Sequence, residues 1–253
     1  LSDDVIIYPG HGEGSSCGKD LSSETIGTLG DQKRTNYALR ENMTKDEFIR
    51  EVLNGLLDPP KYFPDNVMLN KEGYSESDEI INRSFNSLTA NEVNNMLKEK
   101  LIILDVRSVE DFSSSHIPGS IFIGLDGRFA PWVGEILEDV SKKLILVAPE
   151  GREKEAIIRL SRVGFGNVIG YLKGGINSWI KSGGIISKVL NESASKFSTL
   201  DNNKDILDVR SKNEHKSESL LNSINIPLID LSKSIDKVSF EKTFYVHCKG
   251  GYR

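Results

Sequence analysis

The sequence has very few cysteines. It contains two, Cys17 and Cys248, in 253 residues. They are so far apart in the chain that we expect no structural disulfide, and a reducing compartment such as the cytoplasm is the simpler interpretation. Each thiol therefore needs its own explanation.

The sequence also lacks long apolar runs and an excess of positive charge. No run approaches the roughly 18 residues of a membrane-spanning helix, and the N-terminus has neither a charged n-region nor an apolar h-region. The 32 Lys and Arg against 37 Asp and Glu give a net charge of -5, which argues against a basic nucleic-acid platform. Hydrophobic residues make up 38%, as in a globular protein. We predict a soluble, cytoplasmic protein with no nucleic-acid or membrane partner, and allow for a homo-oligomer.

One short sequence occurs twice. LDVRS stands at residues 104–108 and again at 207–211, so that Asp105 and Asp208 are 103 residues apart. A short apolar run precedes each Asp, which is typical of a buried parallel strand that ends in a polar loop. We therefore expect each Asp at the carboxyl end of a strand, where open α/β sheets place their sites.

The first copy predicts strands that alternate with helices. Further strands are expected at 121–125, 144–148 and 168–172. A helix between the last two would place Ala156, Ile157, Leu160 and Val163 on one face and end at Gly164. Thr89 and Glu92 predict a capping box at the start of an earlier helix. The alternation indicates an α/β fold, with a parallel sheet covered by helices on both faces.

We divide the chain into four parts. Residues 87–186 form repeat 1, and residues 200–253 begin a second copy, repeat 2. The Ser- and Lys-rich stretch 187–199 is interpreted as a linker. Residues 1–86 contain one visible strand and about two helices, among them an amphipathic pattern from Phe48 to Leu56, which is too little to build a core. We interpret this part as the tail of a domain whose beginning is missing.

The last six residues carry the most specific signal. They read CKGGYR, which fits CxxGxR directly after an apolar strand at 244–246. The glycines allow peptide N–H groups to surround the thiol of Cys248 as an anion-binding nest. Those donors and Arg253 favour the thiolate, which is the nucleophile and can hold a sulfane sulfur as a persulfide. The alternative is a small buried cysteine before a glycine turn, and the upstream LDVRS argues against it.

Several motifs together resemble the rhodanese (sulfurtransferase) family. They are LDVRS, HIPGS at 116–120, the CxxGxR loop, and a GF, GG and W series at Gly164, Phe165, Gly174, Gly175 and Trp179. The resemblance implies a rhodanese-like parallel sheet. It also implies Cys248 as the sulfur carrier, with a loop of Lys249, Gly250, Gly251, Tyr252 and Arg253.

Repeat 2 follows the family pattern at its front, although Ser219 stands where a His is usual. Asp208 and Arg210 either support the loop through hydrogen bonds or form a structural ion pair. His215 and His247 have weaker cases, and His247 could touch the loop.

Repeat 1 departs from the pattern at its own loop. Counting back from Ala156 and Arg152 assigns residues 147–152 to the CxxGxR positions, with Val147 in place of the cysteine and Glu150 in place of the glycine. Valine forms no persulfide, and a glutamate adds negative charge where a thiolate needs donors. We expect repeat 1 to retain the fold without the chemistry, as a spacer or docking surface.

The N-terminal part carries a second resemblance. YPGHG at 8–12 follows an apolar strand, GSSCG stands at 14–18, and LGDQKRTN at 29–36. Together they resemble the last third of an αββα metallo-β-lactamase domain of the glyoxalase II and persulfide dioxygenase branch. The resemblance implies His11 as a metal ligand, while the HxHxDH ligands of the family are absent from this sequence. Cys17 is either a reactive thiol near that metal pocket or an inert residue in a tight turn.

The order of the parts resembles persulfide dioxygenases that carry tandem rhodanese domains. This resemblance implies an enzyme in its full-length form: an Fe(II) centre oxidises low-molecular-weight thiol persulfides with O2 to sulfite, and Cys248 exchanges sulfane sulfur with thiosulfate or sulfite, in sulfide detoxification. One alternative is a glyoxalase II-like hydrolase with two zinc ions, and another is a rhodanese-like interaction module without activity. We expect this chain by itself to be inactive.

Overall fold

The structure is a computed structural model. It describes residues 1–10, 24–40, 42–54, 62–200, 204–239 and 241–252. The chain forms two compact units, Leu1–Pro59 and Pro60–Arg253. Residues 60–86, which the sequence analysis grouped with the N-terminal part, belong to the second unit.

The first unit contains a short hairpin and helices. Strand β1 (Ile6–Ile7) pairs antiparallel with β2 (Gly27–Thr28). Helix α1 (Leu29–Thr35), the 3-10 turn η1 (Tyr37–Leu39) and helix α2 (Lys45–Leu53) follow. The expected amphipathic helix corresponds to α2, which begins with a capping box between Thr44 and Glu47 and ends at Leu53, whereas Leu56 lies outside the described residues. The buried apolar side chains of the described structure all lie in the second unit, from Tyr62 onwards.

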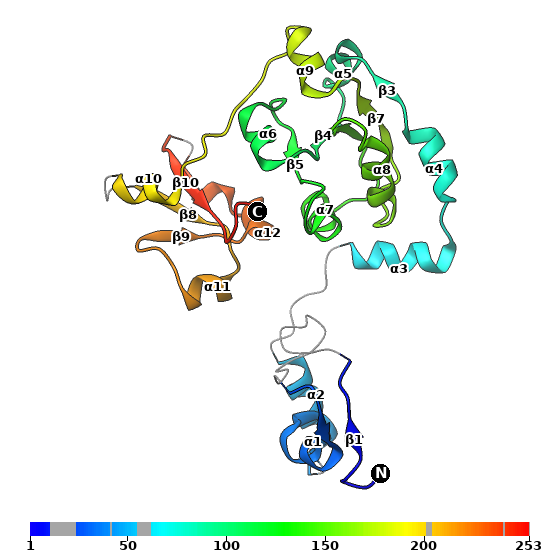
Figure 1. Ribbon diagram of the computed structural model, residues 1–253, viewed down its shortest axis with the longest axis vertical. Coiled ribbons are helices and arrows are strands. Elements are labelled where there is room, and N and C mark those ends of the chain that lie inside the picture. The colour runs from blue at the N-terminus through cyan, green and yellow to red at the C-terminus, as the bar shows by residue number, and fades with distance from the viewer. Residues whose placement is uncertain (11–23, 41, 55–61, 201–203, 240, 253) are drawn as a thin grey trace. The chain divides into compact units, whose positions relative to one another are not determined.

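A five-stranded parallel sheet organises repeat 1. Its strand order is β3 (Ser87–Leu88), β7 (Val168–Leu172), β6 (Leu144–Val147), β4 (Ile102–Asp105) and β5 (Ile121–Phe122), and every neighbouring pair is parallel (Figure 1). The predicted α/β fold class is therefore confirmed. Of the predicted strands, 168–172 matches β7, 144–148 is one residue longer than β6, and 121–125 contributes only two residues to β5.

Helices cover both faces of this sheet. The helices of repeat 1 and of the segment before it are α3 (Phe63–Glu72), α4 (Ser77–Ser84), α5 (Ala90–Met96), α6 (Val109–Ser114), α7 (Phe129–Leu137), α8 (Glu153–Ser161) and α9 (Gly175–Lys181). The capping box of Thr89 and Glu92 starts α5, as predicted. None of the described helices combines the length and apolar character needed to cross a membrane.

The central strand β6 shows why its sequence is continuously apolar. Leu144 and Leu146 face a layer that includes residues of α7 and α8, while Ile145 and Val147 face a layer that includes residues of α5 and α9. Both faces of the strand are buried, so the strand carries no polar alternation. Tyr62 and Ile80 join the layer formed with α7 and α8, which explains why residues before position 87 belong to this unit.

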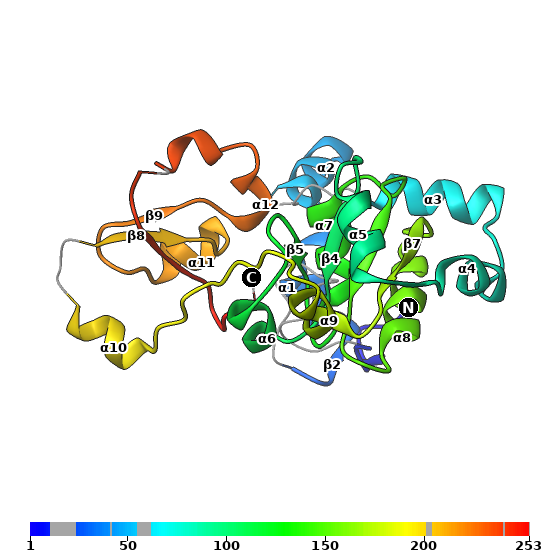
Figure 2. The same ribbon diagram turned by 90° about the horizontal axis from the view of Figure 1, so that it is seen from above.

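Repeat 2 contains a three-stranded parallel sheet. The strand order is β10 (Phe244–His247), β8 (Asp205–Asp208) and β9 (Ser223–Asn225). Helices α11 (Lys212–Ser217) and α12 (Leu228–Leu231) lie near β8 and β9 (Figure 2), and the 3-10 turn η2 (Ile235–Lys237) precedes β10. The pairings of β8 with β9 and β10 reproduce those of β4 with β5 and β6.

The segment predicted as a linker is structured. Ser187 pairs with His116 of repeat 1 in an isolated antiparallel bridge. Further along, the helix α10 (Ala194–Thr199) begins at Ser193, whose side chain accepts the N–H of Lys196. This helix is not predicted from the sequence because a helix of six residues shows little periodicity, and its capping serine is also typical of a linker.

Gly134 lies in α7 directly against Tyr62. A Cβ at this position would stand 2.0 Å from Cδ1 and 2.4 Å from Cγ of the tyrosine. Alanine would otherwise favour a helix interior by about 1 kcal/mol. We expect Gly134→Ala instead to lower the free energy of unfolding by about 1–3 kcal/mol, because the Tyr62 ring must shift out of the core. Denaturation followed by the fluorescence of Trp132 measures this, and Tyr62→Ala in the same chain should remove the overlap. Unchanged stability in the single variant would contradict the packing.

Candidate functional site

Cys248 stands at the carboxyl end of β10, in the loop that follows the strand. The backbone N–H of Gly251 donates to its Sγ at 3.0 Å, and Gly251 has a φ of +77°, which favours glycine. The thiol is half-buried, and, adjoining residues of the chain aside, no atom of the described residues lies within 4 Å of where a Cβ on Gly250 or Gly251 would stand. The sulfur therefore lies in an open glycine loop with one N–H donor directed at it.

A buried carboxylate lies beside this loop. Asp208 is fully buried at the end of β8, and the guanidinium of Arg210 binds both of its oxygens, with Nη2 at 2.8 Å from Oδ2. Nδ1 of His215, on α11, lies 2.9 Å from Oδ2. Arg210 also donates to the Glu218 carbonyl at 2.7 Å. Residues from β8 and α11 thus meet at one carboxylate.

His247 lies next to the Asp208 carboxylate and directly before Cys248 in the chain. It is the residue before Cys248, and its Nε2 lies 3.7 Å from Oδ2 of Asp208, too far for a hydrogen bond. This Nε2 is buried and has no hydrogen-bond partner among the residues that the structure describes. The backbone carbonyl of His247 accepts the N–H of Val209 at 3.1 Å. Asp208, Arg210 and His215, which we name the Asp208 cluster, therefore lie beside the end of β10, where the cysteine loop begins.

The same ion pair occurs in repeat 1. Arg107 binds both oxygens of the fully buried Asp105 and donates to the Ser115 carbonyl at 2.7 Å, as Arg210 does to Glu218. Because repeat 1 has no thiol in its loop, the shared role of the pair is structural: it joins the strand end to the loop after the following helix. The hydrogen bonds described for Arg210 reach Asp208 and Glu218 and do not reach residues 248–252.

Strand pairing corrects the alignment of the two loops. Asp105 pairs with Val147 in repeat 1, and Asp208 pairs with His247 in repeat 2. Val147 is therefore the counterpart of His247, and Ala148 is the counterpart of Cys248. Gly151, with a φ of +81°, matches Gly251, so Glu150 does not replace the loop glycine. The alignment predicted from the helix positions is therefore wrong by one position, because the strand register and not the helix sets where the loop begins. Repeat 1 still has no cysteine at this position.

The two buried aspartates differ in their electrostatics. Burial would raise the pKa of Asp208, but hydrogen bonds from Arg210 and His215 outweigh it and hold that pKa well below its usual range. For Asp105, burial is the larger effect, and its pKa is raised although Arg107 opposes the shift. The hydrogen bond from His215, which has no counterpart on Asp105, therefore favours the ionised carboxylate in repeat 2.

The two repeats should respond differently to acid. Asp208 has a depressed pKa, so its contribution to stability is present above its unfolded pKa of about 3.9 and is lost as the pH falls below it. Asp105 has a raised pKa, and acidification through that value stabilises the folded form of its repeat. Hydrogen exchange below about pH 4 should therefore increase more in β8 and β10 than in β4 and β6. Asp208→Asn should remove this difference, and equal increases in both repeats would contradict the assignment.

Other predicted residues have less support. Lys249 is exposed. His11, Cys17 and Arg253 lie outside the described residues. Among the residues that the structure describes, no group of three or more His, Cys, Asp or Glu side chains could hold a metal ion.

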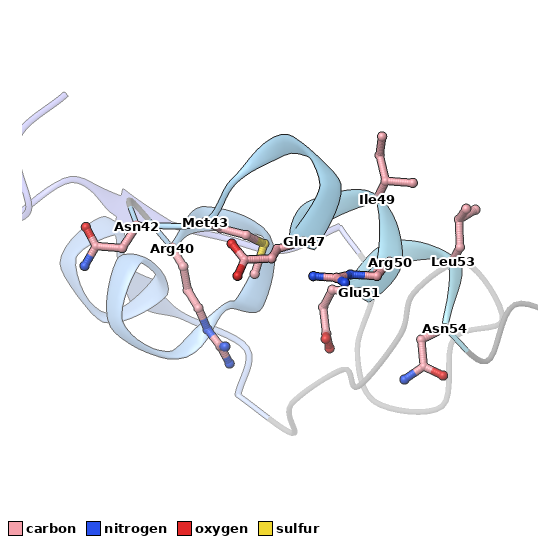
Figure 3. Close-up of a pocket in the computed structure, with 9 residues that line it drawn as sticks. All are labelled: Arg40, Asn42, Met43, Glu47, Ile49, Arg50, Glu51, Leu53 and Asn54. Carbon is pink, nitrogen blue, oxygen red and sulfur yellow. The ribbon is translucent and has the colours of Figure 1, made fainter.

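A pocket of about 810 Å³ opens on α2 in the first unit (Figure 3). Its lining includes Arg40, Met43, Glu47 and Arg50. The carboxylate of Glu47 is bound to Thr44 in the capping box. Positive and negative side chains mix here, and the described lining residues include neither a thiol nor a histidine, so they add no candidate catalytic group.

The cysteine loop makes a hydrogen bond to repeat 1 that the sequence does not predict. The Tyr252 hydroxyl donates to the Gly124 carbonyl of repeat 1 at 2.7 Å. The two residues are 128 positions apart, and nothing local in the sequence indicates the contact. The pairing of His215 with Asp208 was also missed, although the position of His215 near LDVRS offered a weak signal.

Comparison with known proteins identifies the family. A family model described as a rhodanese-like domain matches residues 89–182 and 193–253, more than half of the chain. The chain therefore belongs to the family of rhodanese-like domains, and the matched ranges include both strand-and-loop units described above. A comparison with curated proteins gives no match.

Three solved structures illustrate the similarity. A metallo-beta-lactamase from Staphylococcus aureus subsp. aureus COL is 29% identical, with a TM-score of 0.47, over 68% of this chain and 45% of that chain. A thiosulfate sulfurtransferase from Pseudomonas aeruginosa is 19% identical, with a TM-score of 0.35, over 77% of this chain and 42% of that one. A rhodanese-like domain from Anabaena sp. is 20% identical, with a TM-score of 0.37, over 43% and 86%. This chain thus spans less than half of the first two proteins.

Proposed function

We propose that repeat 2 is the sulfur-carrying part of a sulfurtransferase, with Cys248 as the residue that holds sulfane sulfur as a persulfide. The observation that carries the proposal is the position of its Sγ. It lies at the end of a parallel strand, accepts the Gly251 N–H at 3.0 Å, and has open space around the neighbouring glycines. An N–H donor stabilises negative charge on the sulfur before and after it gains a second sulfur atom.

The proposed reaction has two steps. The Cys248 thiolate attacks the outer sulfur of thiosulfate, the S–S bond of thiosulfate breaks, and sulfite leaves with the bonding electron pair. The persulfide then carries a terminal, negatively charged sulfur. An acceptor thiolate attacks that outer sulfur, forms a new low-molecular-weight persulfide, and releases the Cys248 thiolate. No net oxidation occurs in either step.

Intact mass spectrometry of the full-length protein tests the proposal. After incubation with thiosulfate and removal of the donor, the protein should gain the mass of one sulfur atom, located on Cys248 by peptide mapping. Cyanide should remove it as thiocyanate. A protein that never gains this mass would favour the alternative of an interaction module without activity.

We further propose that the N-terminal part belongs to a persulfide dioxygenase, with Fe(II) as the metal and thiol persulfides as substrates. The support is the YPGHG resemblance at residues 8–12. The described residues offer no ligand set for iron, so we assign no chemical step to it. Metal analysis of the full-length protein discriminates the candidates: one iron with O2 uptake fits the dioxygenase, and two zinc ions with thioester cleavage fit a glyoxalase II-like hydrolase. A cytoplasmic location, inferred from the two cysteines, remains part of the proposal.

A further inference from the structure

Tyr252 joins the cysteine loop to repeat 1. Its hydroxyl donates to the carbonyl of the buried Gly124 at 2.7 Å. Its ring lies against Gly127, where a Cβ would stand 3.1 Å from Cε2 and 3.3 Å from Cζ of the tyrosine. Burial raises the pKa of the Tyr252 phenol, which keeps the hydroxyl protonated as a donor. The contact thus combines a directed hydrogen bond with close packing.

The segment that receives Tyr252 is firmly held. Residues 124–128, which we name the platform, follow β5. The N–H of Leu125 donates to the Val106 carbonyl at 3.1 Å, and the Leu125 carbonyl accepts from Arg159 at 2.6 Å. The Leu125 side chain is buried in the core of repeat 1. A bond to this platform therefore fixes Tyr252 against a rigid body.

The platform also holds the loop of repeat 1. By the strand register, Arg152 is the counterpart of Tyr252, and its guanidinium binds Asp126 of the platform at 3.0 and 3.1 Å. Both loops thus contact the platform: the loop of repeat 1 through the ion pair of Arg152, and the cysteine loop through the Tyr252 hydroxyl. Only one of the two loops carries a thiol.

The chain itself links Tyr252 to the sulfur. Tyr252 directly follows Gly251, whose N–H donates to Sγ of Cys248. At a left-handed glycine with open space around it, the backbone has little else to fix its orientation. Anchoring the next residue therefore restricts the direction in which the Gly251 N–H points.

We propose that Tyr252 is a positioning residue, and that repeat 1, which lacks a loop cysteine, orders the cysteine loop of repeat 2 through the platform. The persulfide role of the loop rests on the proposed function, but the positioning of the thiol does not. In this proposal the function of repeat 1 depends on its fold and does not require a thiol. Repeat 1 keeps the Gly251 N–H directed at Sγ of Cys248.

Alkylation of Cys248 by iodoacetamide in the full-length protein tests this, with the site resolved by peptide mapping. Tyr252→Phe keeps the ring and removes the hydrogen bond. We expect its alkylation near neutral pH to slow by about two- to tenfold, the equivalent of one hydrogen bond, and its pH profile to move to higher pH. An alkylation profile identical to that of the wild type would overturn the proposal. Because alkylation needs no sulfur donor, this result is independent of whether the protein transfers sulfur.

A pair of glycine variants provides the matched control. Gly127→Ala places a methyl group against the Tyr252 ring, whereas Gly119→Ala introduces the same residue at another positive φ in repeat 1 with nothing within 4 Å. Both variants place an alanine at a positive φ, +107° at Gly127 and +79° at Gly119. Only Gly127→Ala should change the alkylation profile of Cys248, and tryptophan fluorescence confirms that repeat 1 is folded in each. Equal profiles in the two glycine variants would also contradict the proposal.

Discussion

Replacing Cys248 by serine is expected to reduce thiosulfate:cyanide sulfur transfer in the full-length protein to background, a loss of at least about three orders of magnitude. A serine hydroxyl is not ionised at neutral pH, and its oxygen cannot form the S–S bond that stores the sulfane sulfur. The substitution replaces one atom in the side chain. Oγ can still accept the Gly251 N–H that Sγ accepts at 3.0 Å, so the loop should stay folded.

Cys17→Ser is the matched control, because it removes the other thiol by the same change. Its transfer rate should equal that of the wild type if Cys248 alone carries sulfur. Residual sulfur transfer in Cys248→Ser would indicate a second sulfur carrier elsewhere in the protein. If the residual transfer disappears in the double variant Cys17→Ser and Cys248→Ser, that carrier is Cys17. The Val147 and Ala148 positions of repeat 1 provide no thiol in either case.

The second large effect concerns stability. Asp208→Ala leaves the Arg210 guanidinium, whose side chain is 15% exposed, with the Glu218 carbonyl as its described hydrogen-bond acceptor and the charges of Glu214 and Glu218 nearby. Removing the buried carboxylate leaves the guanidinium without its main partner, which destabilises the fold more than the loss of an exposed pair does. His215 loses its partner as well. We expect repeat 2 to unfold locally at equilibrium, and we expect the alkylation of Cys248 to lose its dependence on Tyr252.

Asp205→Ala on the same strand provides the comparison. Its partner Lys242 has a side chain that is 60% exposed, and such pairs contribute at most about 1 kcal/mol. Hydrogen exchange of the β8 and β10 amides measures both variants, because Trp132 and Trp179, the two tryptophans of the sequence, lie in repeat 1 and report on that repeat. Equal protection in the two variants would show that the Asp208 cluster does not stabilise repeat 2.

Much of the fold could be predicted because its signals are local. LDVRS marks the ends of β4 and β8, and the continuous apolar run of β6 indicates a strand buried on both faces. The capping box at Thr89 fixes the start of α5. Each of these features depends on residues a few positions apart, so one sequence is enough to recognise them.

The details of the site depend on distant residues and were less accessible. The alignment of Ala148 with Cys248 follows from which strand residues pair, and counting along a helix missed it by one position. The hydrogen bond from Tyr252 to Gly124 joins segments of two different repeats, and no periodicity encodes it. Tertiary contacts of this kind appear only when the sheets are assembled.

The two repeats differ in the length of the segment that precedes the loop strand. Leu144 follows Phe122 by 22 residues, whereas Phe244 follows Asn225 by 19, and the pairing on either side is the same. The segment before the loop strand is therefore where this fold accepts changes in length. In repeat 1 it holds the nine-residue α7, and in repeat 2 the four-residue α12 and the turn η2. A peptide tag or fluorescent label inserted between α12 and β10 should leave the cysteine loop in place, which makes this segment a suitable insertion point for engineering.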